Sequence, residues 1–218
     1  MRLIAILKVM KNILALLADF ANGIFAVLIA AYIYQIEVLY WHILLGIGCA
    51  LIPDIDAISE LIGRGHVSAS AIHLRDHRTF LHYPFFSLPL ALIGIIFFGY
   101  AGVIFGVAVL LHLMNDLYGT GWGITIGWPW SGRRFKIFGR RVNRTKKHLK
   151  ETEDWYHISP SDRKLRLVVC WSADELPKYI QRWGYEKWIE RTYLHLNWTS
   201  SIEYSLFVIA VGLLIIQS

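Results

Sequence analysis

Cysteine is scarce in this chain of 218 residues, which has only Cys49 and Cys170 and no CxxC pair. This scarcity excludes a disulfide framework and a cysteine-rich metal site. Strand-like alternation of any length, internal repeats and low-complexity tracts are also missing. Hydrophobic residues make up 56% of the chain, against roughly 45–50% in a typical soluble domain. Because 17% of the residues are still charged, we expect a polytopic membrane protein with one sizeable polar portion.

Five apolar segments are candidates for membrane-spanning helices, each of which needs about 20 residues. They are residues 20–40, 41–53, 80–98, 100–117 and 202–216, of which the second is short. Residues 1–18 mix three basic side chains with Leu, Ile and Val. This mixture favours an interfacial helix or an extension of the first span over the alternative of a cleaved signal peptide.

Lys and Arg are absent from two short connections between these spans, near residues 35–41 and 98–102. The loop 54–79 carries three of them, and segment 119–200 carries sixteen against eight Asp and Glu. Positive residues near span ends favour the cytoplasmic side. We therefore expect the N-terminus, the loop 54–79 and segment 119–200 in the cytoplasm of a bacterial cell, with the C-terminus outside. The net charge of +6 reflects this topology.

The predicted fold class is an all-α, polytopic membrane protein with about five transmembrane helices and a cytoplasmic helical segment. Within the polar portion, residues 172–196 form an amphipathic pattern that Ser172 or Asp174 would cap. We expect three parts: a membrane-embedded metal-site domain at 1–137, a cytoplasmic or interfacial helical segment at 138–200, and a C-terminal transmembrane helix at 201–218.

Carboxylates and imidazoles stand at the cytoplasmic end of four apolar segments. His112 and Asp116 are four residues apart near the end of the fourth span, so they share one face of a helix. Ionisable side chains inside spans cost about 2.5–3.5 kcal/mol each on insertion scales, so they are usually paired or functional. The other segments contribute Asp19, Asp54, Asp56, His77 and His82.

A divalent metal ion explains such a cluster, because it offsets the carboxylates and accepts lone pairs from neutral imidazoles. Mixed His and carboxylate ligands suit Zn²⁺, with Mn²⁺ or Fe²⁺ as alternatives. A bound ion lowers the pKa of a coordinated water toward about 7 and so makes hydroxide available at neutral pH. Seven candidate ligands leave room for one ion or two.

Each of these residues also has a simpler interpretation. His112 and Asp116 would serve equally as a hydrogen-bonded pair between helices, and Asp54 would cap the helix after a turn. Asp19 would reach the headgroups as an ordinary interfacial acid. His66, His73 and Asp76 share the loop with His77 and are further candidates, whereas no role in the site is expected for His42, His148, His157 or His195.

Four stretches also carry a family resemblance: LIPDID, HRTFLH, HLMND and GTGWGITIGWPWSGRRFKI. In order and spacing, over about residues 19–137, they resemble the motif series of the YdjM-like inner-membrane metal-dependent hydrolases. That family is thought to be distantly related to zinc-dependent phospholipase C and single-strand nucleases. The resemblance implies an inner-membrane location and metal ligands, or their immediate partners, at Asp54, Asp56, His77, His82, His112 and Asp116.

The sequence departs from the family pattern at two places. The family's N-terminal Thr–His pair is replaced by ADFANG, so Asp19 stands where a ligand is expected. The HRGFTHS-like stretch reads HRTFLHY, which keeps both histidines and Arg78 but changes its Thr and Ser. We expect these changes to affect substrate recognition more than metal binding.

The predicted activity is hydrolysis of a phosphoester in a lipid or lipid-linked molecule. Asp54, Asp56 or Asp19 would act as general base, and Arg78 would clamp the phosphate. Arg133 and Arg134 would contact phosphates or anionic lipids. A metal-ion transporter, or a metal-regulated scaffold or adaptor, is the rival interpretation. Membrane lipids are the expected partners, and nucleic acid is not, because the basic run 140–150 lacks interleaved aromatic residues.

Overall fold

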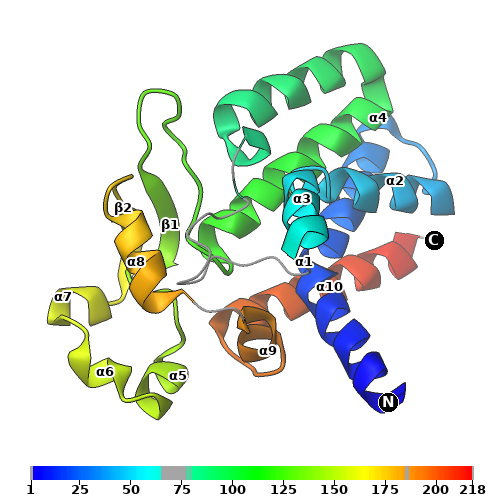
Figure 1. Cartoon of the computed structure of the whole chain (residues 1–218). Helices are drawn as coiled ribbons and strands as arrows, with labels where there is room; N and C mark the ends of the chain where they lie inside the picture. Colours follow the sequence, from blue (N-terminus) through cyan, green and yellow to red (C-terminus); the bar gives the residue numbers. More distant parts are fainter. Residues whose placement is uncertain (1, 65–77, 79, 185–186, 218) are drawn as a thin grey trace.

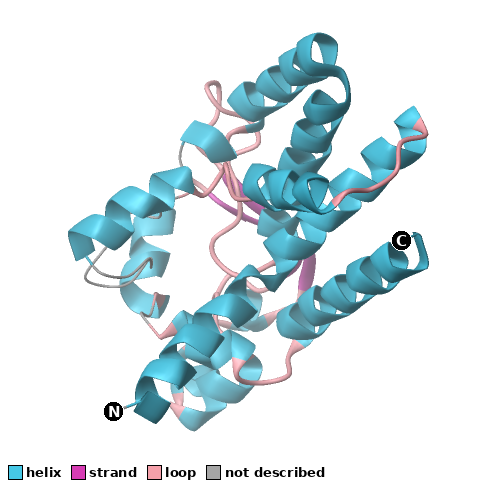
Figure 2. Cartoon of the chain, turned by 90° about the vertical axis from the view of Figure 1, so that its right-hand side faces the viewer, coloured by secondary structure: helices cyan, strands magenta, loops and turns pink. Residues whose placement is uncertain are grey.

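A computed structural model of the chain describes residues 2–64, 78, 80–184 and 187–217. Four apolar helices form one body: α1 (Arg2–Tyr34), α2 (Tyr40–Ala50), α4 (Pro84–Tyr118) and α10 (Trp198–Gln217). The polar segment between α4 and α10 lies beside this body (Figure 1). Helix dominates the described residues, and the strands form one short ribbon among the helices (Figure 2). The predicted helical class is confirmed, with the exception of this ribbon.

Helices α1 and α2 are antiparallel and touch through their backbones. A Cβ atom on Gly23 would lie 2.5 Å from the backbone nitrogen of Ile47, and one on Gly46 would lie 2.4 Å from the carbonyl oxygen of Gly23. Only glycine at both positions allows this approach. Asp19 precedes Gly23 by one turn and Asp54 follows α2, so the crossing brings these carboxylates to the same end of the helix pair.

Helix α4 is a hairpin of two antiparallel arms, as Figure 1 shows. The chain reverses at Gly99, which adopts φ 52° and ψ −121°, a conformation that L side chains rarely adopt. The arms pack closely because a Cβ atom on Gly102 would lie 1.9 Å from the carbonyl oxygen of Gly94. The free ends of the arms, near Pro84 and Tyr118, therefore lie at the same end of the hairpin, which we call its open end.

Two short helices connect α2 to α4. Helix α3 (Ile55–Arg64) follows Asp54, and the 3-10 helix η1 (Phe80–His82) precedes α4. Tyr83 is extended, with φ −86° and ψ 118°, because the residue before a proline avoids helical geometry. This extended residue separates η1 from α4 and leaves His82 buried at the open end of the hairpin.

The polar segment folds around its own apolar core. Strand β1 (Arg134–Gly139) pairs antiparallel with β2 (Arg166–Trp171), with Phe135 opposite Cys170. The core includes Trp122 from the loop after α4, Trp171 from β2 and Trp183 from α8. The short helices around it are α5 (Lys146–Glu151), α6 (Asp154–His157), α7 (Pro160–Arg163), α8 (Leu176–Trp183) and α9 (Trp188–Tyr193).

Three helices among the described residues are long and apolar enough to cross a membrane: 12–34 of α1, α4 and α10. The predicted count of about five spans is not confirmed. The spans expected at 80–98 and 100–117 are the two arms of α4, whereas the one expected at 41–53 is the 11-residue helix α2. Eleven residues rise only about 16 Å, about half of the apolar thickness of a bilayer.

The sequence prediction was wrong about strands, because β1 and β2 exist. Their residues alternate too weakly for a sequence pattern, and each strand pairs with a partner far along the chain. The boundary expected at residue 137 falls inside β1. The helix expected over 172–196 is two helices that separate near Gly184. The N-cap of α8 is Glu175, not Ser172 or Asp174. Ser172 lies in the preceding turn, where its Oγ accepts a hydrogen bond from the Glu175 amide at 3.2 Å and its own amide donates to the Glu175 carboxylate at 3.1 Å.

Candidate metal centre

Side chains from three separate segments converge at the open end of the α4 hairpin. Asp54 comes from the turn after α2, His82 from the end of η1, and His112 from the second arm of α4. One nitrogen or oxygen from each of these three lies within 4.8 Å of the others. The sequence prediction that these segments come together is confirmed for these three residues.

Asp116 adds a fourth donor atom to this group, one helical turn beyond His112. Its Oδ2 lies 3.3 Å from His82 Nε2 and 3.6 Å from His112 Nε2. The two imidazole nitrogens are 3.4 Å apart, and Asp54 Oδ1 lies 3.2 Å from His82 Nε2 and 3.7 Å from His112 Nε2. We call Asp54, His82, His112 and Asp116 the donor cluster.

Asp54, His82 and His112 could together hold a divalent ion, and Asp116 lies beside the two histidines. Donors bound to zinc at about 2.0–2.1 Å are about 3.3 Å apart, close to the five separations given above. Asp116 Oδ2 is buried and has no hydrogen-bond partner among the described residues, an arrangement that costs free energy unless a cation compensates it. Two imidazole nitrogens and two carboxylates also match the ligand preferences of zinc, manganese and iron.

Asp19 lies behind His112 and outside the donor cluster. Its Oδ1 is 2.8 Å from His112 Nδ1, on the opposite side of the ring from the cluster. When Nδ1 donates its proton to Asp19, the lone pair of Nε2 faces the other donors. Carboxylates commonly orient metal-binding histidines in this way. The structure therefore places Asp19 beside His112 and not in the group of Asp54, His82 and His112.

Arg78 is buried beside the donor cluster. Its Nη2 lies 2.7 Å from Asp116 Oδ1, so one carboxylate oxygen faces the guanidinium and the other faces the imidazoles. Arg134 of β1 donates to the backbone carbonyl of Arg78 at 2.9 Å. Gly121 provides the space, because a Cβ atom there would overlap with the Arg78 guanidinium. Residues of the polar segment thus help to position Arg78 against the apolar helices.

Only one member of the donor cluster is substantially exposed. The Asp54 side chain is 31% exposed, whereas those of His82, His112 and Asp116 are 1%, 4% and 8% exposed. Water or a substrate would therefore reach the cluster on the Asp54 side. The cluster is otherwise enclosed by α1, α4 and η1.

The remaining predicted residues lie either outside the described residues or away from the donor cluster. The side chain of Asp56 and all of His66, His73, Asp76 and His77 lie outside the described residues. Arg134 is buried against Arg78, so it is not a headgroup contact, whereas Arg133 is exposed. His42 packs near Tyr100 at the turn of the hairpin, away from the cluster, and His148, His157 and His195 belong to the polar segment.

Two buried charged residues near the site did not enter the sequence prediction. Glu203 of α10 is 3% exposed, receives a hydrogen bond from Tyr193, and interacts electrostatically with Asp19, Asp116 and Arg78. A lone carboxylate in the apolar run 202–216 was the signal that could have found it. Lys136 is buried on β1, and finding it required knowing that residues 134 and 136 share one strand face.

Burial also sets the protonation of groups in the polar segment. It lowers the pKa of Lys136 to about 7, with a further contribution from the positive charge of Arg78. Burial and the neighbouring Glu203 raise the pKa of Tyr193 well above its ordinary value. Lys136 is therefore poised between its two protonation states near neutral pH.

Comparison with known proteins agrees with the sequence motifs. The family model described as YdjM inner membrane protein matches residues 17–173, more than half of the chain and all four members of the donor cluster. No curated protein and no solved structure matches.

Proposed function

Because the chain belongs to the YdjM inner membrane protein family, we propose that it is a membrane-bound, metal-dependent hydrolase. Its substrate in this proposal is a phosphoester of a lipid or a lipid-linked molecule. The observation that carries the proposal is the donor cluster of Asp54, His82, His112 and Asp116 with Arg78 beside it. Zinc is the favoured ion, with manganese and iron as alternatives.

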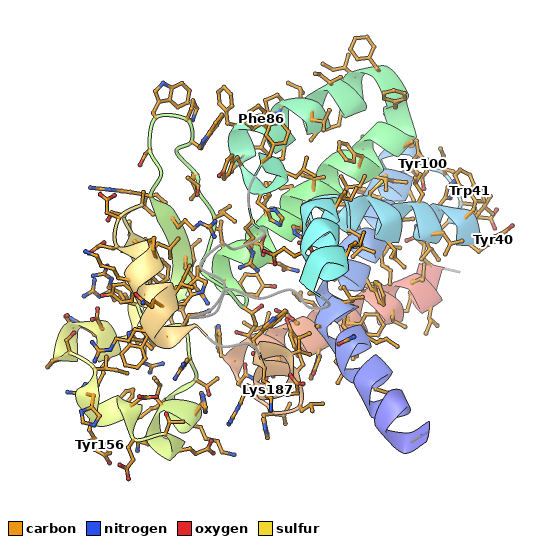
Figure 3. The ribbon with its side chains drawn as sticks, in the orientation of Figure 1. Tyr40, Trp41, Phe86, Tyr100, Tyr156 and Lys187 are labelled. Carbon is orange, nitrogen blue, oxygen red and sulfur yellow. The ribbon has the colours of Figure 1, made fainter. Side chains whose placement is uncertain are left out.

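Aromatic side chains support a site at headgroup depth. Tyr40, Trp41 and Tyr100 gather near the turn of the α4 hairpin, whereas Phe86 lies toward its open end (Figure 3). Phe86 packs on Trp128 with ring centroids 4.9 Å apart. Tryptophan and tyrosine favour both interfaces of a bilayer. This distribution favours a hairpin that crosses the membrane and a donor cluster near one surface.

The proposed orientation puts the donor cluster on the cytoplasmic side. The polar segment, which carries most of the Lys and Arg, adjoins the open end of the hairpin through Arg134 and Arg78. The opposite end lies near the connection 35–41, which has no Lys or Arg. The positive-inside rule therefore assigns the open end to the cytoplasm.

The surrounding residues supply the other requirements of hydrolysis. A bound divalent ion supplies Lewis acidity and a water of lowered pKa. Asp19 fixes the orientation of His112, and Arg78 holds Asp116 while contributing positive charge for phosphoryl oxygens. Asp54, the exposed carboxylate, lies where substrate and water arrive. Helices α1 and α4 exclude bulk water from the remaining three donors.

Hydrolysis of vesicle-presented phospholipids by purified protein tests this proposal. The zinc-loaded protein should release a phosphorylated or dephosphorylated product, lose activity with a chelator and regain it with added zinc. His82→Gln should reduce the rate at least a hundredfold, because it removes a donor, and the matched change His157→Gln in α6 should have little effect. A zinc-loaded protein that hydrolyses no phosphoester, while admitting metal ions into sealed vesicles, would favour the transporter instead.

A further inference from the structure

A basic cavity of about 400 Å³ adjoins Arg78 on its side away from the membrane-embedded helices. It is enclosed by the loop after α4, β1, α5 and the ends of α8, α9 and α10. No Asp or Glu occurs among the described residues that line it. Five basic residues do: Arg78, Lys136, Arg140, Arg144 and Lys146. Arg78 also pairs with Asp116 and Arg144 with Asp154, so Lys136, Arg140 and Lys146 contribute most of the uncompensated charge. A cavity of this size matches ordinary ligand pockets, and its charge selects an anion.

Lys136 is a buried lysine in the wall of this cavity. Its Nζ donates to the carbonyl oxygen of Gly121 at 3.3 Å and to Asn143 Oδ1 at 3.1 Å, both neutral acceptors. A buried ammonium among neutral partners is costly, and an anion in the cavity would offset that cost. Several aromatic side chains complete the wall, among them Trp183, Trp188 and Trp198.

Arg78 joins this basic cavity to the donor cluster. Its guanidinium lines the cavity and also contacts Asp116 at 2.7 Å. A ligand in the cavity therefore lies directly next to the group that faces a phosphate at the metal site. Arg78 is thus a group that the cavity and the donor cluster share.

An apolar pocket of about 230 Å³ lies on another side of the donor cluster. Its lining includes Pro53, which precedes Asp54, and Leu81, which precedes His82. Phe86 and Leu90 of the first α4 arm and Phe105 and Val109 of the second complete it. Because five of its lining residues belong to α4, a candidate membrane span, a hydrocarbon chain from the bilayer is the occupant that its surroundings favour.

We propose that the substrate is an amphiphile with a second phosphate beyond the phosphoester at the metal site, its hydrocarbon chain in the apolar pocket and its second phosphate in the basic cavity. This proposal rests on the proposed function and narrows its substrate class to lipid diphosphates and their relatives. A zwitterionic headgroup would place a cation among five basic side chains.

Binding of two hydrolysis-resistant probes tests this inference on the full-length, zinc-loaded protein in detergent. Farnesyl methylenediphosphonate should bind at least tenfold more tightly than farnesyl phosphonate, which lacks the second anionic group. Lys146→Glu should reduce this preference to threefold or less. Its neighbour Lys147, which is outside the cavity lining and whose side chain is 76% exposed, gives the matched control Lys147→Glu, which should keep the preference.

Asn143→Asp provides a second test inside the cavity with almost no change in volume. The new carboxylate would face Lys136 and occupy the place of the anion, so the preference should disappear. An unchanged preference in both Lys146→Glu and Asn143→Asp, or an equal loss in Lys147→Glu, would overturn the inference. Because the probes resist hydrolysis, failure of the proposed catalytic activity would leave the preference intact, and failure of the preference would leave hydrolysis intact.

Discussion

Asp19 illustrates how a single residue acts on the centre without belonging to it. Its carboxylate contacts Nδ1 of His112, whereas the donor cluster lies on the Nε2 side. Asp19→Asn keeps a hydrogen-bond acceptor but loses the charge. We expect zinc affinity to fall about 10- to 100-fold, with full occupancy still reached at saturating zinc. Competition with a chelating dye measures both quantities, and lost stoichiometry at saturation would make Asp19 a direct ligand.

Lys136 predicts a pH dependence of stability. Its pKa is about 7 in the folded protein against an ordinary value of 10.5, so unfolding takes up a proton between these pH values. The free energy of unfolding contributed by this residue therefore rises as pH increases from about 7 to about 10, and the penalty is fully present below about 7. Lys136→Met should remove this rise.

Thermal unfolding midpoints of wild type and Lys136→Met in detergent, at pH 7 and pH 9, measure the effect. The difference between the two pH values should be larger in wild type, because other titrating groups are common to both proteins. An identical pH response in the two proteins would mean that Lys136 keeps its ordinary pKa in the folded state.

The sequence predicted which individual residues come together where residue spacing and the ends of the apolar segments were informative. Four-residue spacing predicted that His112 and Asp116 share a face, and span ends predicted that Asp54 and His82 join them. It did not separate the ligand His112 from its partner Asp19, because both roles place a carboxylate near an imidazole. Only the distances to the two ring nitrogens distinguish those roles.

The close crossing of α1 and α2 makes a prediction at the scale of elements. Gly23→Ala would place a Cβ atom 2.5 Å from the backbone of Ile47, so the helices must separate. We expect a loss of about 1–3 kcal/mol of stability, together with weaker zinc binding, because Asp19 lies on α1 and Asp54 in the turn directly after α2. The matched control is Gly48→Ala in α2, where a Cβ atom would meet nothing within 4 Å.

Thermal unfolding and zinc titration of both glycine variants test this role of the crossing. Gly48→Ala should retain wild-type stability or gain slightly, since alanine favours helix over glycine. Equal behaviour of the two variants would mean that the crossing does not position the carboxylates.

The elements themselves were only partly predictable. Apolar length located α1, α4 and α10, and the missing Lys and Arg located the hairpin turn near Gly99. Strands β1 and β2 were not predicted, because charged residues interrupt β1 and its pairing partner lies far along the chain. Consequently the sequence did not predict that Arg134 and Lys136 share a buried strand face, and it did not predict the basic cavity that Lys136 lines.

In the whole molecule, the proposed orientation places the polar segment and α3 together on the cytoplasmic side of the membrane. Single cysteines at Gly63, Lys147 and Glu37, introduced after Cys49 and Cys170 are replaced by serine, test this arrangement in intact cells. A membrane-impermeant thiol reagent should label the cysteine at position 37 and leave the other two unlabelled until the membrane is disrupted. Labelling at position 147 in intact cells would reverse the orientation.

The proposed function depends on a metal ion bound by the donor cluster. The zinc content of purified protein is the direct test of this binding. Elemental analysis should find about one or two ions per wild-type chain. His112→Gln and Asp116→Asn should each insert into the membrane and fold but contain much less metal, because an amide is a poor ligand and the lost carboxylate no longer offsets the cation. His42→Gln, which changes a buried histidine near the hairpin turn, should keep the wild-type content. Full metal occupancy in both cluster variants would contradict the account, because His112 and Asp116 would then be packing residues.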